Sequence, residues 1–207
     1  MTRRLRKAAQ PLTLLACVLP LAWLAARATG LVGPWLGANP VEAIRDALGI
    51  GGLRLLLLTL AVRPLATTLR QPWLFGLRRT LGVSAFAYLA LHFLVWLGLE
   101  QWFTWSAVLA DIVKRPYITL GFVGLVLLLP LALTSTDRAM RRLRRDWHRL
   151  HTLIYPAAVL GCAHFWWQVK ADIREPLLYA ALLAALLGWR WRRARMQAPV
   201  LPSGVRT

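Results

Sequence analysis

Three of the four histidines in this 207-residue sequence, His92, His151 and His164, lie within or at the edge of long apolar runs. An ionisable side chain is costly inside a bilayer and therefore marks a candidate functional site. Imidazole is also a common axial ligand of haem iron. A functional interpretation thus depends on where these histidines lie. The fourth, His148, belongs to an arginine-rich segment and is expected at the surface.

The composition is that of an integral membrane protein. Hydrophobic residues make up 58% of the chain and charged residues 16%, which is more apolar than soluble domains normally are. A membrane-spanning helix needs about 20 predominantly apolar residues. We therefore expect an all-α membrane protein, a bundle of six transmembrane helices forming a single domain over residues 1–207, with no internal repeat. The expected spans are residues 11–28, 52–69, 80–99, 117–134, 150–168 and 176–191.

The net charge of +18 is distributed unevenly along the chain. With the N-terminus in the cytoplasm and the spans alternating, most basic residues fall inside, including the six arginines from Arg138 to Arg149. Arg45 and Arg54 fall outside, where acidic residues nearly balance the basic ones. This is the positive-inside pattern. It predicts cytoplasmic termini, with lipid rather than nucleic acid meeting the basic segments.

The first span allows a second interpretation. Ala26-Arg27-Ala28 resembles a signal-peptide cleavage site, and cleavage would leave five spans. We expect the segment to be retained, because its apolar run is long enough to cross the bilayer.

Cys17 and Cys162 lie in expected spans without a CxxC motif, so neither a disulfide nor a thiolate metal site is predicted.

The loops carry further signals. Ser135-Thr136-Asp137 is suited to cap an interfacial helix over the basic segment that follows it. Pro116 and Pro176 fit the first turns of the fourth and sixth spans. The outer loops before these prolines mix charges of both signs and are candidates for docking an external protein.

His92 and His164 are expected at one depth in the outer half of the bilayer. His92 lies eight residues before Glu100 and His164 six residues before Lys170, a difference of about 3 Å along a helix. Two histidines at one depth on different helices can ligate a haem between them. Gly161 would leave room for the macrocycle, and Tyr88 would share the face of His92. Without a CxxCH motif such a haem would be b-type.

His151 is harder to place. It lies 13 residues before His164, about 19.5 Å towards the cytoplasm and rotated by about 140° on an ideal helix, unless Pro156 bends that helix. A histidine partner would be needed near position 79, where the sequence has Arg78 and Arg79. The sequence therefore predicts one haem, or two if His151 finds another axial ligand. A flavin or a quinone at His151 is the alternative.

Four motifs resemble a known family: Arg115–Thr119, Leu131–Thr136, Trp147–His151 and Val169–Pro176. The chain is similar to the haem-binding membrane subunits of periplasmic protein-methionine-sulfoxide reductase systems, within the ferric-reductase-like transmembrane group. The resemblance implies b-type haem, an associated FMN, and electron delivery from the quinone pool to a periplasmic molybdopterin-dependent catalytic subunit that reduces methionine sulfoxide. It places the haem histidines at His92, His151 and His164.

The sequence lacks a GxGxxG motif and a P-loop, so the chain is not expected to take hydride from a nicotinamide nucleotide unaided. An electron-transfer cytochrome subunit, without the catalytic site for methionine sulfoxide, is the favoured hypothesis. A proton-coupled transporter with the histidines as a relay is the alternative, but no carboxylates lie within the spans. A membrane scaffold without cofactor would leave the histidines unexplained.

Overall fold

The computed structural model describes residues 2–33, 36–169 and 172–196, and all regular elements in these ranges are helices. The expected all-α class is confirmed. The long helices are α1 (Thr2–Ala28), α2 (Pro40–Thr68), α3 (Leu77–Val95), α5 (Pro116–Leu133), α8 (Ile154–Gln168) and α9 (Arg174–Met196). Shorter helices are α4 (Trp105–Lys114), α6 (Asp137–Leu143) and α7 (Arg145–Leu150).

Four segments are long and apolar enough to cross a bilayer: Ala8–Ala28 in α1, Pro40–Thr68, Pro72–Glu100 and Pro116–Leu133. The third contains a short 3₁₀ turn at Pro72–Gly76, all of α3, and a π-helical turn at Trp96–Glu100. The chain is thus a multi-pass membrane protein. With 15 residues, α8 is only about 22 Å long, so the expected count of six spans stays a prediction.

Helix α2 begins 12 residues earlier than the expected span. Asn39 caps it, since its side chain accepts a hydrogen bond from the Glu42 backbone N–H at 3.3 Å, and Pro40 opens the first turn. Arg54, expected near the outer end of its span, is therefore preceded by more than three further turns of helix. Arg54 lies mid-helix, donates to the Tyr179 hydroxyl at 2.7 Å and pairs with Glu175 of α9 at 3.4 Å.

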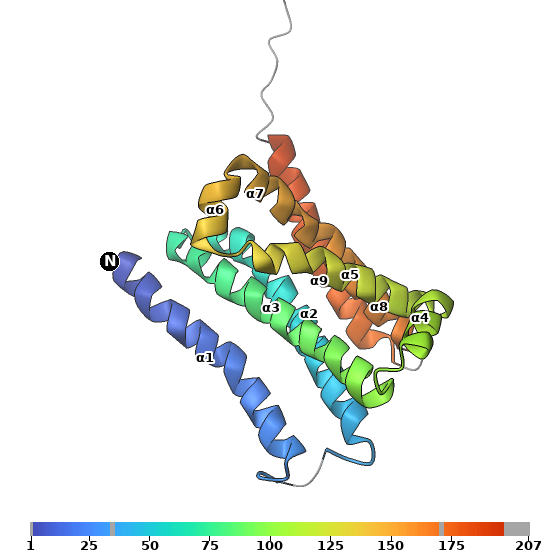
Figure 1. Ribbon diagram of the computed structural model, residues 1–207. Coiled ribbons are helices and arrows are strands. Elements are labelled where there is room, and N and C mark those ends of the chain that lie inside the picture. The colour runs from blue at the N-terminus through green and yellow to red at the C-terminus, as the bar shows by residue number, and fades with distance from the viewer. Residues whose placement is uncertain (1, 34–35, 170–171, 197–207) are drawn as a thin grey trace, which may run out of the picture.

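The core lies between α2, α3, α5, α8 and α9 (Figure 1). Ala85 of α3 and Ala157 and Ala158 of α8 are almost completely buried, because small side chains let neighbouring helices approach closely. Helix α1 lies along one side of the bundle. It is tied to α3 by the Tyr88 hydroxyl, which donates to the Cys17 carbonyl at 2.7 Å.

The basic segment folds as two short helices. Thr136 caps α6 as expected, accepting from the Ala139 N–H at 3.2 Å. The expectation of one continuous interfacial helix is wrong, because Arg144 adopts a left-handed φ of 47° and turns the chain between α6 and α7. The Trp147 indole then donates to the Thr134 carbonyl at 3.0 Å and holds α7 against the end of α5.

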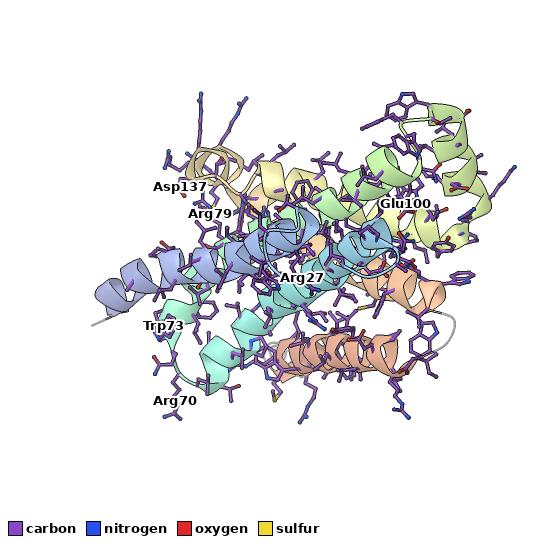
Figure 2. The ribbon with its side chains drawn as sticks, turned by 90° about the horizontal axis from the view of Figure 1, so that it is seen from below. Arg27, Arg70, Trp73, Arg79, Glu100 and Asp137 are labelled. Atoms are coloured by element: carbon purple, nitrogen blue, oxygen red, sulfur yellow. The ribbon has the colours of Figure 1, made fainter. Side chains whose placement is uncertain are left out.

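The two ends of the bundle differ in the elements they carry. The start of α1, helices α6 and α7, and the end of α9 lie at one end, whereas α4 lies at the other (Figure 1). Figure 2 shows Arg79 beside its ion-pair partner Asp137 near the first end and Glu100 at the second. The arginine-rich segments therefore gather at one end of the described structure.

Candidate haem-binding site

A cavity of about 660 Å³ lies between α2, α3, α5 and α8. This volume is typical of cofactor sites. Its walls are mainly apolar and include Leu53, Leu89, Phe93 and Phe122, and its polar end is formed around Arg45. His92 of α3 and His164 of α8 both line it.

The structure brings His92 and His164 next to each other in this cavity, with their rings in a T-shaped arrangement. Their ring centroids are 6.2 Å apart and their planes form an angle of 80°. Both side chains are half-buried. The two histidines predicted to share a depth are therefore neighbours in space, although they lie 72 residues apart in the sequence.

Each imidazole is oriented by a backbone carbonyl on another helix. His92 Nδ1 is 2.8 Å from the Arg45 carbonyl oxygen on α2, and His164 Nδ1 is 2.6 Å from that of Tyr117 on α5. Since a carbonyl oxygen only accepts, Nδ1 carries the proton in each ring and donates it. Nε2 is then the nitrogen left with a lone pair, as in histidines that ligate metals.

The spacing of the rings fits an iron between them. With a metal–nitrogen bond of about 2 Å and the ring centre about 1.1 Å further on, two axial imidazoles have centroids roughly 6 Å apart. The observed 6.2 Å agrees with this value. No group of three or more His, Cys, Asp or Glu suited to a metal ion occurs among the described residues. The chemistry of two imidazoles in an apolar cavity fits a haem, whose macrocycle supplies the other four ligands.

The polar end of the cavity is cross-linked by charges. Arg45 pairs with Glu100 at 2.7 Å and with Asp46 at 3.0 Å, which joins α2 to the end of the α3 segment. Arg115 pairs with Asp111 at 3.1 Å. The pKa of Arg115 is raised by its hydrogen bond to the Tyr117 hydroxyl and by the negative charge of Asp111, so this guanidinium remains cationic beside the cavity.

His151 does not line the cavity. It opens a 3₁₀ turn at His151–Leu153, and α8 begins only at Ile154. The estimate of its rotation on one ideal helix is therefore wrong, and the change of helix type precedes Pro156. The ring stacks on Trp147 with centroids 3.8 Å apart, and Nδ1 donates to the Trp147 carbonyl at 3.0 Å. Nε2 is buried without a hydrogen-bond partner among the described residues.

Other expectations can be compared with the structure. Gly161 lines the cavity as expected. Tyr88 shares with His92 the face of α3 that packs on α2, where the two rings lie against Gly51 and Gly49, but Tyr88 does not line the cavity. His148 is exposed, as predicted. Cys17 and Cys162 are both free and buried.

Gly49 and Gly121 are site residues that the sequence analysis missed. A Cβ at Gly49 would lie 2.9 Å from His92 Nδ1, and one at Gly121 would lie 2.8 Å from His164 Nδ1. Both glycines therefore leave room for the imidazoles. The available signal was the presence of glycine in otherwise leucine-rich helices, where it is unfavourable unless a close approach requires it.

Comparison with known proteins identifies the family. Residues 48–162 match the family described as ferric reductase like transmembrane component. A protein of Xanthomonas campestris pv. campestris (strain 8004), named protein-methionine-sulfoxide reductase heme-binding subunit MsrQ, is 54% identical over 76% of this chain and 73% of its own length. The protein of the same name from Caulobacter vibrioides is 48% identical over 91% of this chain and 89% of its own. The chain belongs to the MsrQ family.

The resemblance noted from the four motifs is thus confirmed, and it extends over most of the chain. The matched region of this MsrQ family member contains His92 and His151 and ends two residues before His164. No solved structure matches the chain.

Proposed function

We propose that this chain is the haem-binding membrane subunit of a protein-methionine-sulfoxide reductase system. In this proposal it binds haem b between His92 and His164 and delivers electrons from the quinone pool to a periplasmic molybdopterin-dependent catalytic subunit. The observation that carries the proposal is the pair of imidazoles 6.2 Å apart in an apolar cavity. The names of the two relatives support it.

The chain contributes orientation and burial to this function. The carbonyls of Arg45 and Tyr117 hold the two rings with Nε2 free for iron. The walls formed by Leu53, Leu89 and Phe122 exclude water from the site. Haem would supply one-electron oxidation and reduction, while the protein sets its potential through ligands and burial. Methionine sulfoxide itself would be reduced on the partner subunit.

We further propose one domain over residues 1–207 with six spans, α8 and α9 being the last two. Helix α8 packs on α5, and α9 packs on α8 and α2. The arginine-rich segments α6 and α7 and the end of α9 would then face the cytoplasm of a bacterium with this protein in its inner membrane. Helix α4 and the charged end of the cavity would face the periplasm, where the catalytic subunit would dock.

His151 is the proposed contact for a second cofactor at the cytoplasmic end. Its buried Nε2 has no partner in the described structure, and the charge of Arg78 acts on its ring. Because Nδ1 carries the ring proton, Nε2 is left with a lone pair, which the iron of a second haem, an N–H of FMN or the hydroxyl of a reduced quinone would engage. Arginine would also suit the phosphate of FMN or a haem propionate.

The proposal is tested by purifying the protein in detergent and recording visible spectra in the oxidised and reduced states. The wild type is expected to show a Soret band and the spectrum of a six-coordinate b-type haem. His92→Ala and His164→Ala should each lose most of this haem, because one axial ligand is removed from a site that has only two. His148→Ala is the matched control, since that histidine is exposed, and it should keep full occupancy.

Haem per chain, measured as the pyridine haemochrome, then determines the role of His151. A second haem would halve the ratio in His151→Ala, whereas a flavin or quinone contact would leave it unchanged. A wild-type protein without a Soret band would refute the haem proposal and favour the proton-coupled transporter. Full occupancy in both His92→Ala and His164→Ala would refute the ligand pair alone.

A further inference from the structure

The carbonyl and the glycine that contact each imidazole repeat one pattern. In each hydrogen bond, 47 residues separate the carbonyl from the histidine: Arg45 to His92, and Tyr117 to His164. A glycine follows each carbonyl by four residues and lies against the ring of the same histidine. The corresponding positions differ by 72 residues, from 45 to 117, from 49 to 121 and from 92 to 164.

The sequence around these positions repeats with the same offset. Leu48-Gly-x-x-Gly-Leu-x-Leu-Leu-Leu57 in α2 corresponds to Leu120-Gly-x-x-Gly-Leu-x-Leu-Leu-Leu129 in α5. In the following helices, Leu81, Ala85, His92 and Phe93 correspond to Leu153, Ala157, His164 and Phe165. The expectation of no internal repeat is therefore wrong. The pair α2–α3 and the pair α5–α8 are two copies of one unit.

The buried positions of the two units agree as well. Ala85 and Ala157 have exposed fractions of 0% and 1%, and Leu56 and Leu128 are both buried in the core. The first helix of each unit packs on the second, α2 on α3 and α5 on α8. The 72-residue offset thus relates packing positions in addition to residue types.

We propose that Gly49 and Gly121, each with the carbonyl four residues before it, form two copies of an imidazole clamp that holds the axial ligand planes nearly perpendicular. This inference rests on the proposed function, because the planes become ligand planes only with iron between them. The clamps make Gly49 and Gly121 positioning residues. They touch the ligand rings and act on the metal through them.

The clamp is tight on one edge of each ring. A Cβ at position 49 would lie 2.9 Å from Nδ1 and 3.0 Å from Cε1 of His92, and one at position 121 would lie 2.8 Å and 3.0 Å from the same atoms of His164. The added methyl group would thus meet each ring at Nδ1, the atom that donates to the backbone carbonyl. A methyl group there must move the ring, because the backbone of a packed helix moves less easily than a side chain.

The test is electron paramagnetic resonance of the oxidised holoprotein, whose low-spin spectrum depends on the angle between the axial imidazole planes. With planes near the observed 80°, the wild type should give a strongly anisotropic low-spin signal with a large maximal g value. Gly49→Ala and Gly121→Ala should each lower this g value or convert part of the haem to the high-spin form. Conversion to the high-spin form should be accompanied by a lower haem occupancy in the visible spectrum.

Two further glycines provide controls. A Cβ at Gly51 would lie 2.8 Å from the ring of Tyr88, which does not line the cavity, so Gly51→Ala disturbs the packing of α2 on α3 without meeting an imidazole or a cavity wall. A Cβ at Gly188 would meet nothing within 4 Å. Both variants should retain the wild-type signal in whatever haem they bind. Loss of haem in Gly49→Ala with retention in Gly51→Ala supports the clamp.

Three outcomes would overturn the inference. They are a wild-type signal of the rhombic kind typical of near-parallel ligands, an unchanged signal in both Gly49→Ala and Gly121→Ala, or equal haem loss in Gly49→Ala and Gly51→Ala. Each of these requires a haem-containing wild type. Failure of the proposed function is distinct, because the wild type would then contain no haem.

Discussion

At the scale of single residues, the site depends on groups that act on the histidines from other helices. Arg45 has two separate roles. Its backbone carbonyl bonds His92, whereas its guanidinium pairs with Glu100 at the cavity end. A side-chain substitution can remove the second role and leave the first.

We therefore predict that Arg45→Gln keeps its haem but lowers stability. The Arg45 and Glu100 side chains have exposed fractions of 18% and 27%, so the change leaves a partly buried carboxylate without its partner. The expected cost is about 1–3 kcal/mol, measured as a lower midpoint of thermal unfolding in detergent. Arg149→Gln is the control, because its pair with Asp146 is exposed (86% and 74%) and such pairs contribute little. Equal midpoints for Arg45→Gln and the wild type would contradict this prediction.

At the scale of elements, two side-chain hydrogen bonds join the described part of α1 to other elements. The Tyr88 hydroxyl reaches its middle, and Gln10 near its start donates to the Gly76 carbonyl at 3.4 Å. Most of its leucines face outward. Its position against α3 should therefore respond to the loss of a single hydrogen bond.

Tyr88→Phe is expected to loosen α1 by about 1 kcal/mol, the usual net value of one hydrogen bond. Transient exposure of Cys17 should then rise about fivefold, measured as its rate of alkylation by N-ethylmaleimide with detection by mass spectrometry. Cys162, buried in the core, is the internal reference and should keep its rate. An unchanged ratio of the two rates would show that the hydroxyl does not hold α1.

The elements also show what could be predicted from sequence. The apolar runs predicted most of the long helices, but the start of α2 was missed because Glu42, Arg45 and Asp46 interrupt the pattern. Arg45 pairs with Glu42 and Asp46 beside it, and also with Glu100, a partner distant in the sequence that the local pattern does not reveal. The shared depth of His92 and His164 followed from charge and helix rise. Their orientation could not be predicted, because it depends on carbonyls 47 residues upstream.

The break at Arg144 illustrates another limit. Its left-handed backbone divides the basic segment and brings His151 into a 3₁₀ turn. A non-glycine residue adopts that conformation only when the surrounding contacts require it. Here the Trp147 indole bond to Thr134 supplies such a contact. The orientation of the His151 side chain therefore could not be predicted from the local sequence alone.

At the scale of the whole molecule, the proposed orientation predicts which residues meet each side of the membrane. Single cysteines at Lys114 and Arg141, in a chain whose two native cysteines are replaced by serine, place one probe at each end of the bundle. Both positions are exposed. In spheroplasts, Lys114→Cys should react with an impermeant maleimide, and Arg141→Cys should react only after permeabilisation. The converse result would reverse the orientation.

The division of the bundle into two related pairs has a consequence for its assembly. Each pair contributes one of the two facing imidazoles. A metal bound by both would cross-link α3 to α8, two helices that are far apart in the sequence. Cofactor insertion and final compaction would then be one cooperative event, since whatever binds only the folded form draws the equilibrium towards it.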